Sequence, residues 1–150
     1  GYFDVSMNNY YKKMTYNKLA MHSYLFPEPD EEQLLAYEDI YPREYYLPYN
    51  ETTNPTGYVD HADRSARQFS MLKRAIEFIA DDVPNNINLD RNNDGLVDNV
   101  IFIVKGNVSG WSTLLWPHCW EMGEGYDAYI NGKKVYSFNF QLETSDKFTV

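Results

Sequence analysis

The chain has 150 residues and a formal net charge of −9, which fits one domain with a proper core and argues against nucleic acid or an anionic membrane as a partner. No apolar run approaches the length of a membrane span. Aromatic residues make up 17% of the chain and 14 of them are tyrosines, so we expect a tyrosine-lined core or binding surface, and the single cysteine excludes an internal disulfide.

Two patterned segments open the chain. Apolar residues at helical spacing predict a short helix over residues 5–14, with Ser6 as its amino-terminal cap and Asn17 as the left-handed residue that ends it. In residues 18–26, apolar side chains fall on both alternating faces. Since a strand covered on both sides shows that pattern, we expect a buried strand there.

Residues 27–59 form a proline- and tyrosine-rich excursion. Five prolines break any long helix or strand, and the segment is longer than an ordinary connection, so it is either a functional flap or a variable insertion. Its tyrosines fit two interpretations: they pin the loop to the body of the domain, which we favour, or they form a recognition surface. These tyrosines are Tyr41, Tyr45, Tyr46, Tyr49 and Tyr58.

The clearest helix is predicted for residues 60–80. Asp60 occupies the capping position, and His61 beside it is expected to be a solvated or capping histidine, because no second metal ligand stands at a suitable spacing from it. One face is apolar and the other charged, so the helix should pack on the core. The apolar stripe is Ala62, Ala66, Phe69, Leu72, Ile76 and Ile79, and the charged face is Arg64, Arg67, Lys73 and Glu77.

An acidic loop, residues 90–98, leads directly into the most apolar run of the chain. Oxygen-bearing side chains, a glycine where the backbone must turn and one free carbonyl are what a short loop needs to wrap a hard cation, so we predict a calcium site. An EF-hand is excluded, because its twelfth position, which needs a bidentate Glu, is Ile101. The alternative is a set of Asx-turns without an ion. The predicted ligands are the side chains of Asp90, Asn92, Asp94 and Asp98 and the carbonyl of Leu96.

The apolar run over residues 97–104 is short and rich in β-branched residues, which predicts a buried central strand. Together with the strand over residues 18–26 and the helix over residues 60–80, it would make a strand-helix-strand unit. We expect its two strands to be parallel and its crossover to be right-handed.

Three tryptophans, His118 and Cys119 fall within residues 111–120. Neighbours in an extended segment point in opposite directions, so His118 and Cys119 cannot form a catalytic pair, and we favour a buried aromatic cluster with a hydrogen-bonded histidine. The chain has no paired-histidine zinc motif, phosphate-binding glycine loop or serine elbow. Its own residues therefore give no complete active site.

The carboxyl-terminal part of the chain alternates strictly between apolar and polar residues. The dipeptide Asn131-Gly132 predicts a tight hairpin, and residues 135–143 should form an antiparallel strand with one wet face. The expected inward side chains are Tyr136, Phe138, Phe140 and Leu142, and the outward ones are Ser137, Asn139 and Gln141.

Four stretches in this order resemble the amino-terminal half of the catalytic domain of immune-inhibitor-A-like metallopeptidases: residues 6–19, residues 90–103, Trp116-Pro117-His118 and residues 135–138. That family consists of secreted bacterial zinc endopeptidases. The resemblance implies an α/β fold, a zincin-like amino-terminal subdomain with a mixed twisted sheet and packed helices, present as a single partial domain over residues 1–150. It also implies a secreted or cell-surface protein that acts on peptide or protein substrates.

The zinc site of that family is not in this sequence. A His-Glu-x-x-His helix that follows the sheet supplies two zinc ligands and the general base, and the sequence ends at Val150, about where the family pattern would enter that helix. The resemblance therefore implies that Zn²⁺ binds only with residues beyond Val150. The catalytic and zinc-binding residues would be absent here, and this chain alone would be inactive.

The resemblance also implies a substrate cleft. In zincin-like folds an antiparallel edge strand ahead of the active-site helix binds the extended substrate through its backbone, a role that would fall to residues 135–142. The candidate cleft residues are Trp116, His118, Ser137, Asn139 and Gln141.

Two further expectations concern partners and function. The inward side chains of residues 135–142 would lack part of their cover without the active-site helix, so we expect the chain to associate with itself. A function of a different class remains open, a stand-alone calcium-stabilised binding module with a tyrosine-lined surface.

Overall fold

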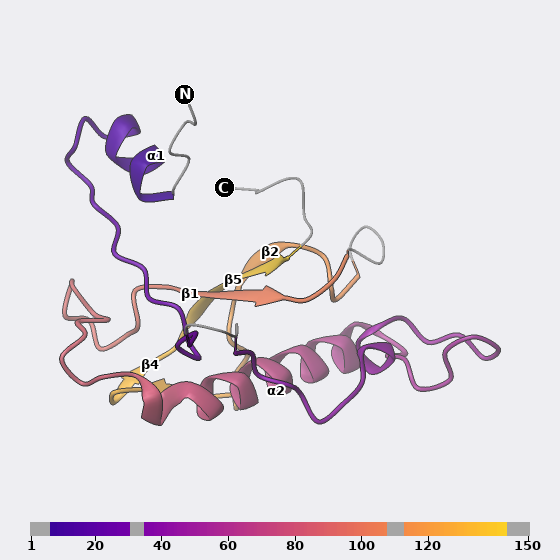
Figure 1. The fold of residues 1–150 in the computed structure, drawn as a ribbon. Helices are drawn as coiled ribbons and strands as arrows, with labels where there is room; N and C mark the ends of the chain where they lie inside the picture. The colour runs from indigo at the N-terminus through magenta and orange to yellow at the C-terminus, as the bar shows by residue number, and fades with distance from the viewer. Residues whose placement is uncertain (1–6, 31–34, 108–112, 144–150) are drawn as a thin grey trace. The chain divides into compact units, whose positions relative to one another are not determined.

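The computed structural model describes residues 7–30, 35–107 and 113–143. The chain divides into two compact units, residues 1–35 and residues 36–150, and Figure 1 shows the elements of each. Within the described ranges, none of the helices combines the length and the apolar character that crossing a membrane requires.

In the first unit, helix α1 spans Met7–Met14, which confirms the predicted helix over the part that is described. The chain leaves α1 through two residues with left-handed backbone, Tyr16 at φ 52° and Asn17 at φ 63°, and the Asn17 N–H donates to a carbonyl in the last turn over 2.7 Å. Asparagine tolerates this conformation because its short side chain can hydrogen-bond locally. The predicted stop is therefore confirmed, whereas the predicted cap, Ser6, lies outside the described residues.

The strand predicted over residues 18–26 is wrong, because this segment has no regular secondary structure. The side chains of Leu19, Tyr24 and Leu25 are all exposed. An apolar pattern on both faces makes a strand only where other elements cover both faces, and these side chains lack that cover. The strand-helix-strand unit that was expected to begin here is therefore wrong as well.

The second unit contains a three-stranded sheet with the order β1-β5-β2. Strand β1 spans Val100–Val104, β2 spans His118–Glu121 and β5 spans Ser137–Leu142. Strand β5 pairs in parallel with β1 and antiparallel with β2, so the sheet is mixed. The strand expected at an edge is therefore the central one, and β1, expected at the centre, lies at an edge of the described sheet.

The residue pattern of β5 explains its central position. Phe138, Phe140 and Leu142 are buried, and the residues between them are half-buried, so β5 has partial cover even on its polar face. Tyr136 precedes the strand and is exposed, so its predicted inward orientation is wrong. Its hydroxyl donates to the Glu121 carboxylate over 2.6 Å, which keeps the polar end of the ring at the surface.

Strand β1 is covered less completely than its composition predicts. Val100, Phe102 and Val104 are half-buried, while Ile101 and Ile103 between them are exposed. Successive side chains of a strand point to opposite faces, so only one face of β1 contributes to the core. An unbroken apolar run rich in β-branched residues predicts the strand correctly but not its burial on both faces.

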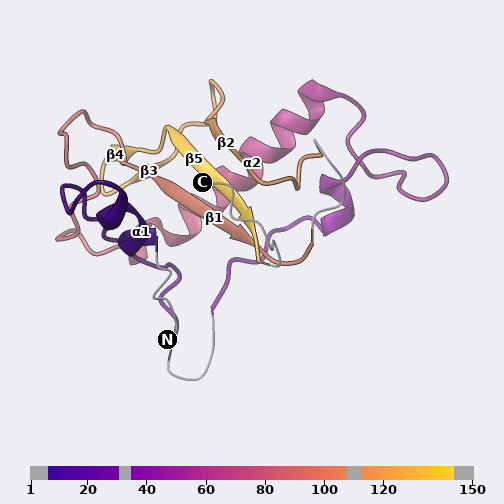
Figure 2. The same cartoon turned by 90° about the horizontal axis from the view of Figure 1, so that it is seen from above.

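Helix α2 spans His61–Ile79 and lies along one face of the sheet in both views (Figures 1 and 2). The Asp60 carboxylate caps it by accepting the Asp63 N–H over 2.8 Å. Leu72 and Ile76 are each 1% exposed, as is expected of an apolar stripe that faces the core. Burying a side chain of this size stabilises the fold by roughly 1.5–3 kcal/mol. The predicted helix and its cap are confirmed, and the packing role is confirmed for Leu72 and Ile76, whereas Ala62 of the predicted stripe is exposed.

Short elements complete the second unit. A tight turn joins β3 to β4 through Asn131 at φ 51° and Gly132 at φ 74°, which confirms the hairpin predicted from this dipeptide. The short elements are η1 at Arg43–Tyr46, η2 at Ala80–Asp82, β3 at Tyr129–Ile130 and β4 at Lys133–Lys134.

Candidate functional site

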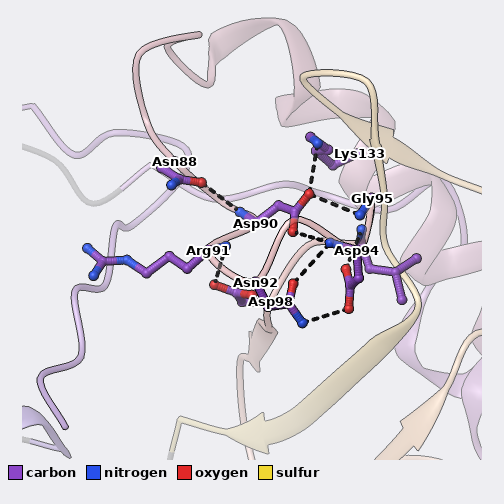
Figure 3. Close-up of polar contacts among 9 residues, drawn as sticks. Asn88, Asp90, Arg91, Asn92, Asp94, Gly95, Asp98 and Lys133 are labelled. Carbon is purple, nitrogen blue, oxygen red and sulfur yellow. Dashed lines mark hydrogen bonds and ion pairs between the residues drawn. The ribbon is translucent and has the colours of Figure 1, made fainter. Parts of the chain in front are cut away.

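The acidic loop of residues 90–98 folds around the side chain of Asp90 (Figure 3). Asp90 is 3% exposed, and its two carboxylate oxygens accept the N–H groups of Asp94 and Gly95, each over 3.0 Å. Gly95 has a φ of 87°, a conformation that glycine adopts without steric cost. The sharp turn that the sequence predicts at this glycine is therefore present.

A lysine supplies positive charge to this buried carboxylate. Lys133 Nζ lies 2.7 Å from Asp90 Oδ2 (Figure 3). This hydrogen bond lowers the pKa of Asp90, whereas burial raises it. The backbone N–H groups of Gly95 and Asp94 lower the pKa further. Because an unpaired buried charge is costly, Lys133 allows Asp90 to stay ionised inside the loop.

The structure brings only some of the other predicted calcium ligands together. The Asn92 amide donates to Asp94 over 2.7 Å, and the other oxygen of Asp94 accepts the Leu96 N–H over 2.8 Å. Asp98 instead accepts the Arg91 N–H over 3.2 Å. Across the described ranges, no three His, Cys, Asp or Glu side chains stand close enough to hold a metal ion. The side-chain oxygens of Asn92 and Asp94 each accept the N–H two residues further on, which is the Asx-turn contact of the alternative interpretation.

The loop is held against the β3-β4 hairpin by two backbone hydrogen bonds. The Val97 N–H donates to the Lys134 carbonyl over 2.9 Å, and the Lys134 N–H donates to the Gly95 carbonyl over 3.1 Å. This pairing brings Lys133 next to Asp90 and leaves a polar hollow of about 290 Å³ lined in part by both residues. The hairpin that the sequence predicts therefore helps to build the loop.

His118 in β2 is a half-buried histidine held on both ring nitrogens. Its ring stacks on Phe140 with centroids 5.3 Å apart and planes at 20°. Nδ1 donates to the Trp116 carbonyl, and Nε2 accepts from the side-chain amide of Gln68 in α2. Burial lowers the pKa of His118, the hydrogen bond to Trp116 opposes this, and the charge of Arg64 lowers the pKa further. The predicted hydrogen-bonded histidine is confirmed, whereas the predicted burial is wrong for Trp120 and Cys119, which are both exposed. Trp111 of the same predicted cluster lies outside the described residues.

The predicted cleft residues lie on two different faces of the sheet. His118 stands opposite Phe140 in the strand register, so its side chain shares the face of β5 that is buried. Ser137, Asn139 and Gln141 alternate onto the other face. The sheet therefore does not bring His118 together with these three side chains, and Trp116 lies in the segment just before β2.

Sequence reasoning missed a polar cluster around Asp39 in the excursion. Its carboxylate accepts the hydroxyls of Tyr37, over 2.7 Å, and of Tyr46, and it accepts two N–H groups of Arg74 in α2 over 2.8 and 3.0 Å. Burial raises the pKa of Asp39, but the hydrogen bonds from Arg74, Tyr46 and Tyr37 lower it overall to about 2. Burial and the Asp39 carboxylate raise the pKa of Tyr46. A lone Asp among tyrosines has no spacing signal, so this cluster could not be found from the sequence.

Further contacts fix the tyrosines of the excursion to α2. The rings of Tyr41 and Tyr45 stack with centroids 4.1 Å apart and planes at 14°. The Arg67 guanidinium lies 3.9 Å from the Tyr45 ring centroid and donates to the Tyr45 carbonyl over 2.7 Å, so its predicted outward orientation is wrong. The interpretation of the tyrosines as pins is confirmed for Tyr45 and Tyr46, while Tyr41 and Tyr49 remain exposed.

An open hollow of about 560 Å³ lies among these tyrosines, and we call it the tyrosine hollow. Its size is that of ordinary ligand pockets. Its lining, which also includes Thr56, Gly57 and Arg67, contains the aromatic and apolar residues Tyr41, Pro42, Tyr45, Tyr49, Pro55 and Val59.

Comparison with known proteins returns no match: no protein-family model, no curated protein and no solved structure matches the chain.

Proposed function

We propose that this chain is the amino-terminal part of a secreted zinc-dependent endopeptidase and forms the sheet-bearing half of its catalytic domain. The observation that carries the proposal is an antiparallel strand, β2, at the edge of a mixed sheet beside β5. Zincin-like folds bind extended substrates along such a strand through the backbone. The resemblance of four sequence stretches to immune-inhibitor-A-like metallopeptidases supports the same function.

In this proposal the substrate-binding strand is β2 and not β5. Strand β5 has neighbours on both sides, because Phe138 and Phe140 are paired with β1 and also with β2. Strand β2 pairs with β5 alone among the described strands, so its other edge is available to an extended peptide. Trp120 in β2 is 64% exposed and would contact a substrate side chain, and Trp116 and His118 remain cleft candidates beside it.

The zinc ion of the proposed enzyme would be held by residues downstream of Val150. No group of side chains in the described part of this chain fits zinc, so no catalytic step is assigned to its residues. When bound, zinc would supply an activated water for attack on a peptide carbonyl. This chain would contribute the sheet and the peptide-binding edge, and we expect it to cleave nothing by itself.

The decisive experiment is to read the natural coding frame downstream of Val150 and to assay the longer protein. We expect a His-Glu-x-x-His helix, and hydrolysis of a fluorogenic peptide that a chelator abolishes and Zn²⁺ restores. Trp120→Ala in the longer protein should raise KM, while Tyr129→Ala, in β3, should not. A frame without the motif, or a longer protein that is inactive with Zn²⁺, would overturn the proposal.

We also propose that the acidic loop binds Ca²⁺ through the side chains of Asp90, Asn92, Asp94 and Asp98 and the Leu96 carbonyl. All five donors are hard oxygen atoms, which calcium prefers. In the structure the Lys133 ammonium contacts Asp90, so a calcium ion would have to displace it.

A second candidate function is a stand-alone calcium-stabilised binding module, which the tyrosine hollow favours. Calcium would stabilise the chain under either function, so a calcium effect cannot separate them. A coding frame that lacks the zinc motif would favour the module, and zinc-dependent hydrolysis by the longer protein would favour the endopeptidase.

A further inference from the structure

We propose that the tyrosine hollow binds a proline-rich, positively charged peptide segment in the polyproline II conformation. This binding activity does not depend on the zinc site or on the edge of β2. It therefore goes beyond the proposed hydrolysis and can be tested in this chain alone.

The walls of the hollow have the chemistry that such peptides recognise. Three tyrosines and two prolines contribute to the lining, and two of the tyrosines, Tyr41 and Tyr49, are 41% and 48% exposed. Aromatic-lined grooves bind polyproline II segments because the proline rings pack against aromatic rings and the peptide is already ordered before it binds. Tyrosine hydroxyls can in addition donate to the carbonyls of the peptide, which has no internal hydrogen bonds.

The hollow is also built on a fixed backbone. A bridge pairs Pro48 with Tyr58, and the Tyr58 N–H donates to the Leu47 carbonyl over 2.9 Å. A side chain at Gly57 would place its Cβ 2.5 Å from the same carbonyl oxygen, so this position accepts only glycine without a backbone shift. A preformed site loses little conformational entropy when a ligand binds.

The charges around the hollow favour a cationic ligand. Three exposed carboxylates, Glu44, Glu51 and Asp60, lie within two residues of a lining residue along the chain. Against them stands one cation outside the lining, Arg43, whose guanidinium donates to the carbonyls of Lys105 and Asn107. The cation in the wall, Arg67, is paired with Asp63 over 2.7 Å and is therefore already neutralised. The whole chain carries a charge of −9, which attracts a basic peptide during diffusional encounter.

The test uses fluorescence anisotropy with three labelled peptides of equal length, built from Pro-Pro-Arg, Gly-Ser-Arg and Pro-Pro-Glu repeats. The Pro-Pro-Arg peptide should bind with one-to-one stoichiometry and about tenfold or more tighter than either of the others, a difference typical of a few well-packed contacts. Binding should weaken as salt is added, because the exposed carboxylates Glu44, Glu51 and Asp60 contribute to it. Equal affinity for the Pro-Pro-Arg and Gly-Ser-Arg peptides, or no binding of the Pro-Pro-Arg peptide, would overturn the proposal.

Two variants locate the site. Tyr49→Ala removes an exposed ring of the lining and should weaken Pro-Pro-Arg binding by about tenfold, whereas Tyr129→Ala, on a similarly exposed tyrosine outside the hollow, should not change it. Glu51→Gln should weaken binding of the Pro-Pro-Arg peptide without changing the fold. Circular dichroism checks that each variant is folded. Undiminished binding by both Tyr49→Ala and Glu51→Gln would overturn the assignment to this hollow.

Discussion

The carboxylate of Asp90 and the ammonium of Lys133 lie 2.7 Å apart although 43 residues separate them along the chain. Asp90 is almost fully buried in the acidic loop, while the Lys133 side chain is 41% exposed and comes from the hairpin. The lysine therefore satisfies the same carboxylate that a calcium ion would need. Competition between these two cations makes the proposed calcium site testable by mutation of either partner.

Lys133→Ala should lower the melting temperature in chelator, because it leaves the Asp90 carboxylate buried without its ionic partner. In saturating Ca²⁺ the variant should recover, so its calcium-induced shift in melting temperature should exceed that of the wild type. Lys134→Ala is the matched control, since Lys134 pairs with the exposed Asp127. Differential scanning fluorimetry with and without calcium measures all three proteins.

The same measurement can also disprove the proposed calcium site. If calcium does not raise the melting temperature of the wild type, or raises that of Asp94→Ala by an equal amount, the loop is not a calcium site. A smaller calcium shift in Lys133→Ala than in the wild type would show that Lys133 supports the ion and does not compete with it. If calcium does not stabilise the wild type, the Asx-turns and Lys133 are sufficient to hold the loop.

Asp39→Asn should destabilise the second unit by about 2 kcal/mol, because it removes a charged acceptor that serves two tyrosines and Arg74. Glu38→Gln, at the exposed neighbouring position, should change the free energy of unfolding by less than about 0.5 kcal/mol. Urea denaturation followed by tyrosine and tryptophan fluorescence measures both. If the two variants are equally stable, the cluster does not hold the excursion to α2.

Acid should weaken the same cluster in a defined direction. The pKa of Asp39 is about 2 in the folded protein, below its ordinary value of 3.8, so its contribution is fully present above about pH 4 and is lost as the pH falls through 2. The acid limb of the stability curve should therefore be less steep in Asp39→Asn than in the wild type. Parallel acid limbs in the two proteins would contradict the assignment of this limb to Asp39.

Local chemistry in this chain was predictable where the signal lay within a few residues. The cap at Asp60, the left-handed stop at Asn17, the turn at Asn131-Gly132 and the alternation of β5 all follow from neighbouring residues, and the structure shows each of them. In these places a single side chain or dipeptide satisfies backbone groups that have few other partners.

Long-range placement was not predictable from the same patterns. The order of strands depends on which edges meet, and nothing in an apolar run such as that of β1 says whether one or both faces will be covered. The partners of Asp90, His118 and Asp39 come from residues 43, 50 and 35 positions away. For that reason the buried amide Gln68, which looks like a surface residue of α2, could not be recognised as the partner of His118.

Stability should fall as the pH decreases below about 6.5, in part because of His118. Its pKa in the folded state is lowered, so the unfolded chain binds the proton more readily, and the contribution of the neutral ring is present above 6.5 and lost below it. One such group changes the free energy of unfolding by at most about 1.4 kcal/mol per pH unit. Gln68→Glu replaces the amide donor with a carboxylate that stabilises the imidazolium, so this loss should shrink or reverse in the variant. An unchanged pH profile would contradict the role of His118.

Self-association is expected from a different face of the sheet than the sequence predicts. Phe138, Phe140 and Leu142 are buried, so they cannot provide the uncovered surface. On β1, however, Ile101 and Ile103 are 39% and 64% exposed, and adjacent exposed apolar side chains favour association.

Ile103→Lys should therefore suppress concentration-dependent association, because a lysine on this face cannot be desolvated without a partner. Ile40→Lys is the matched control, since Ile40 is 70% exposed and lies in the excursion, outside the sheet. Sedimentation velocity over a range of concentrations should show association in the wild type and in Ile40→Lys but a monomer in Ile103→Lys. A wild type that stays monomeric at high concentration would show that this exposed face does not drive association of the chain.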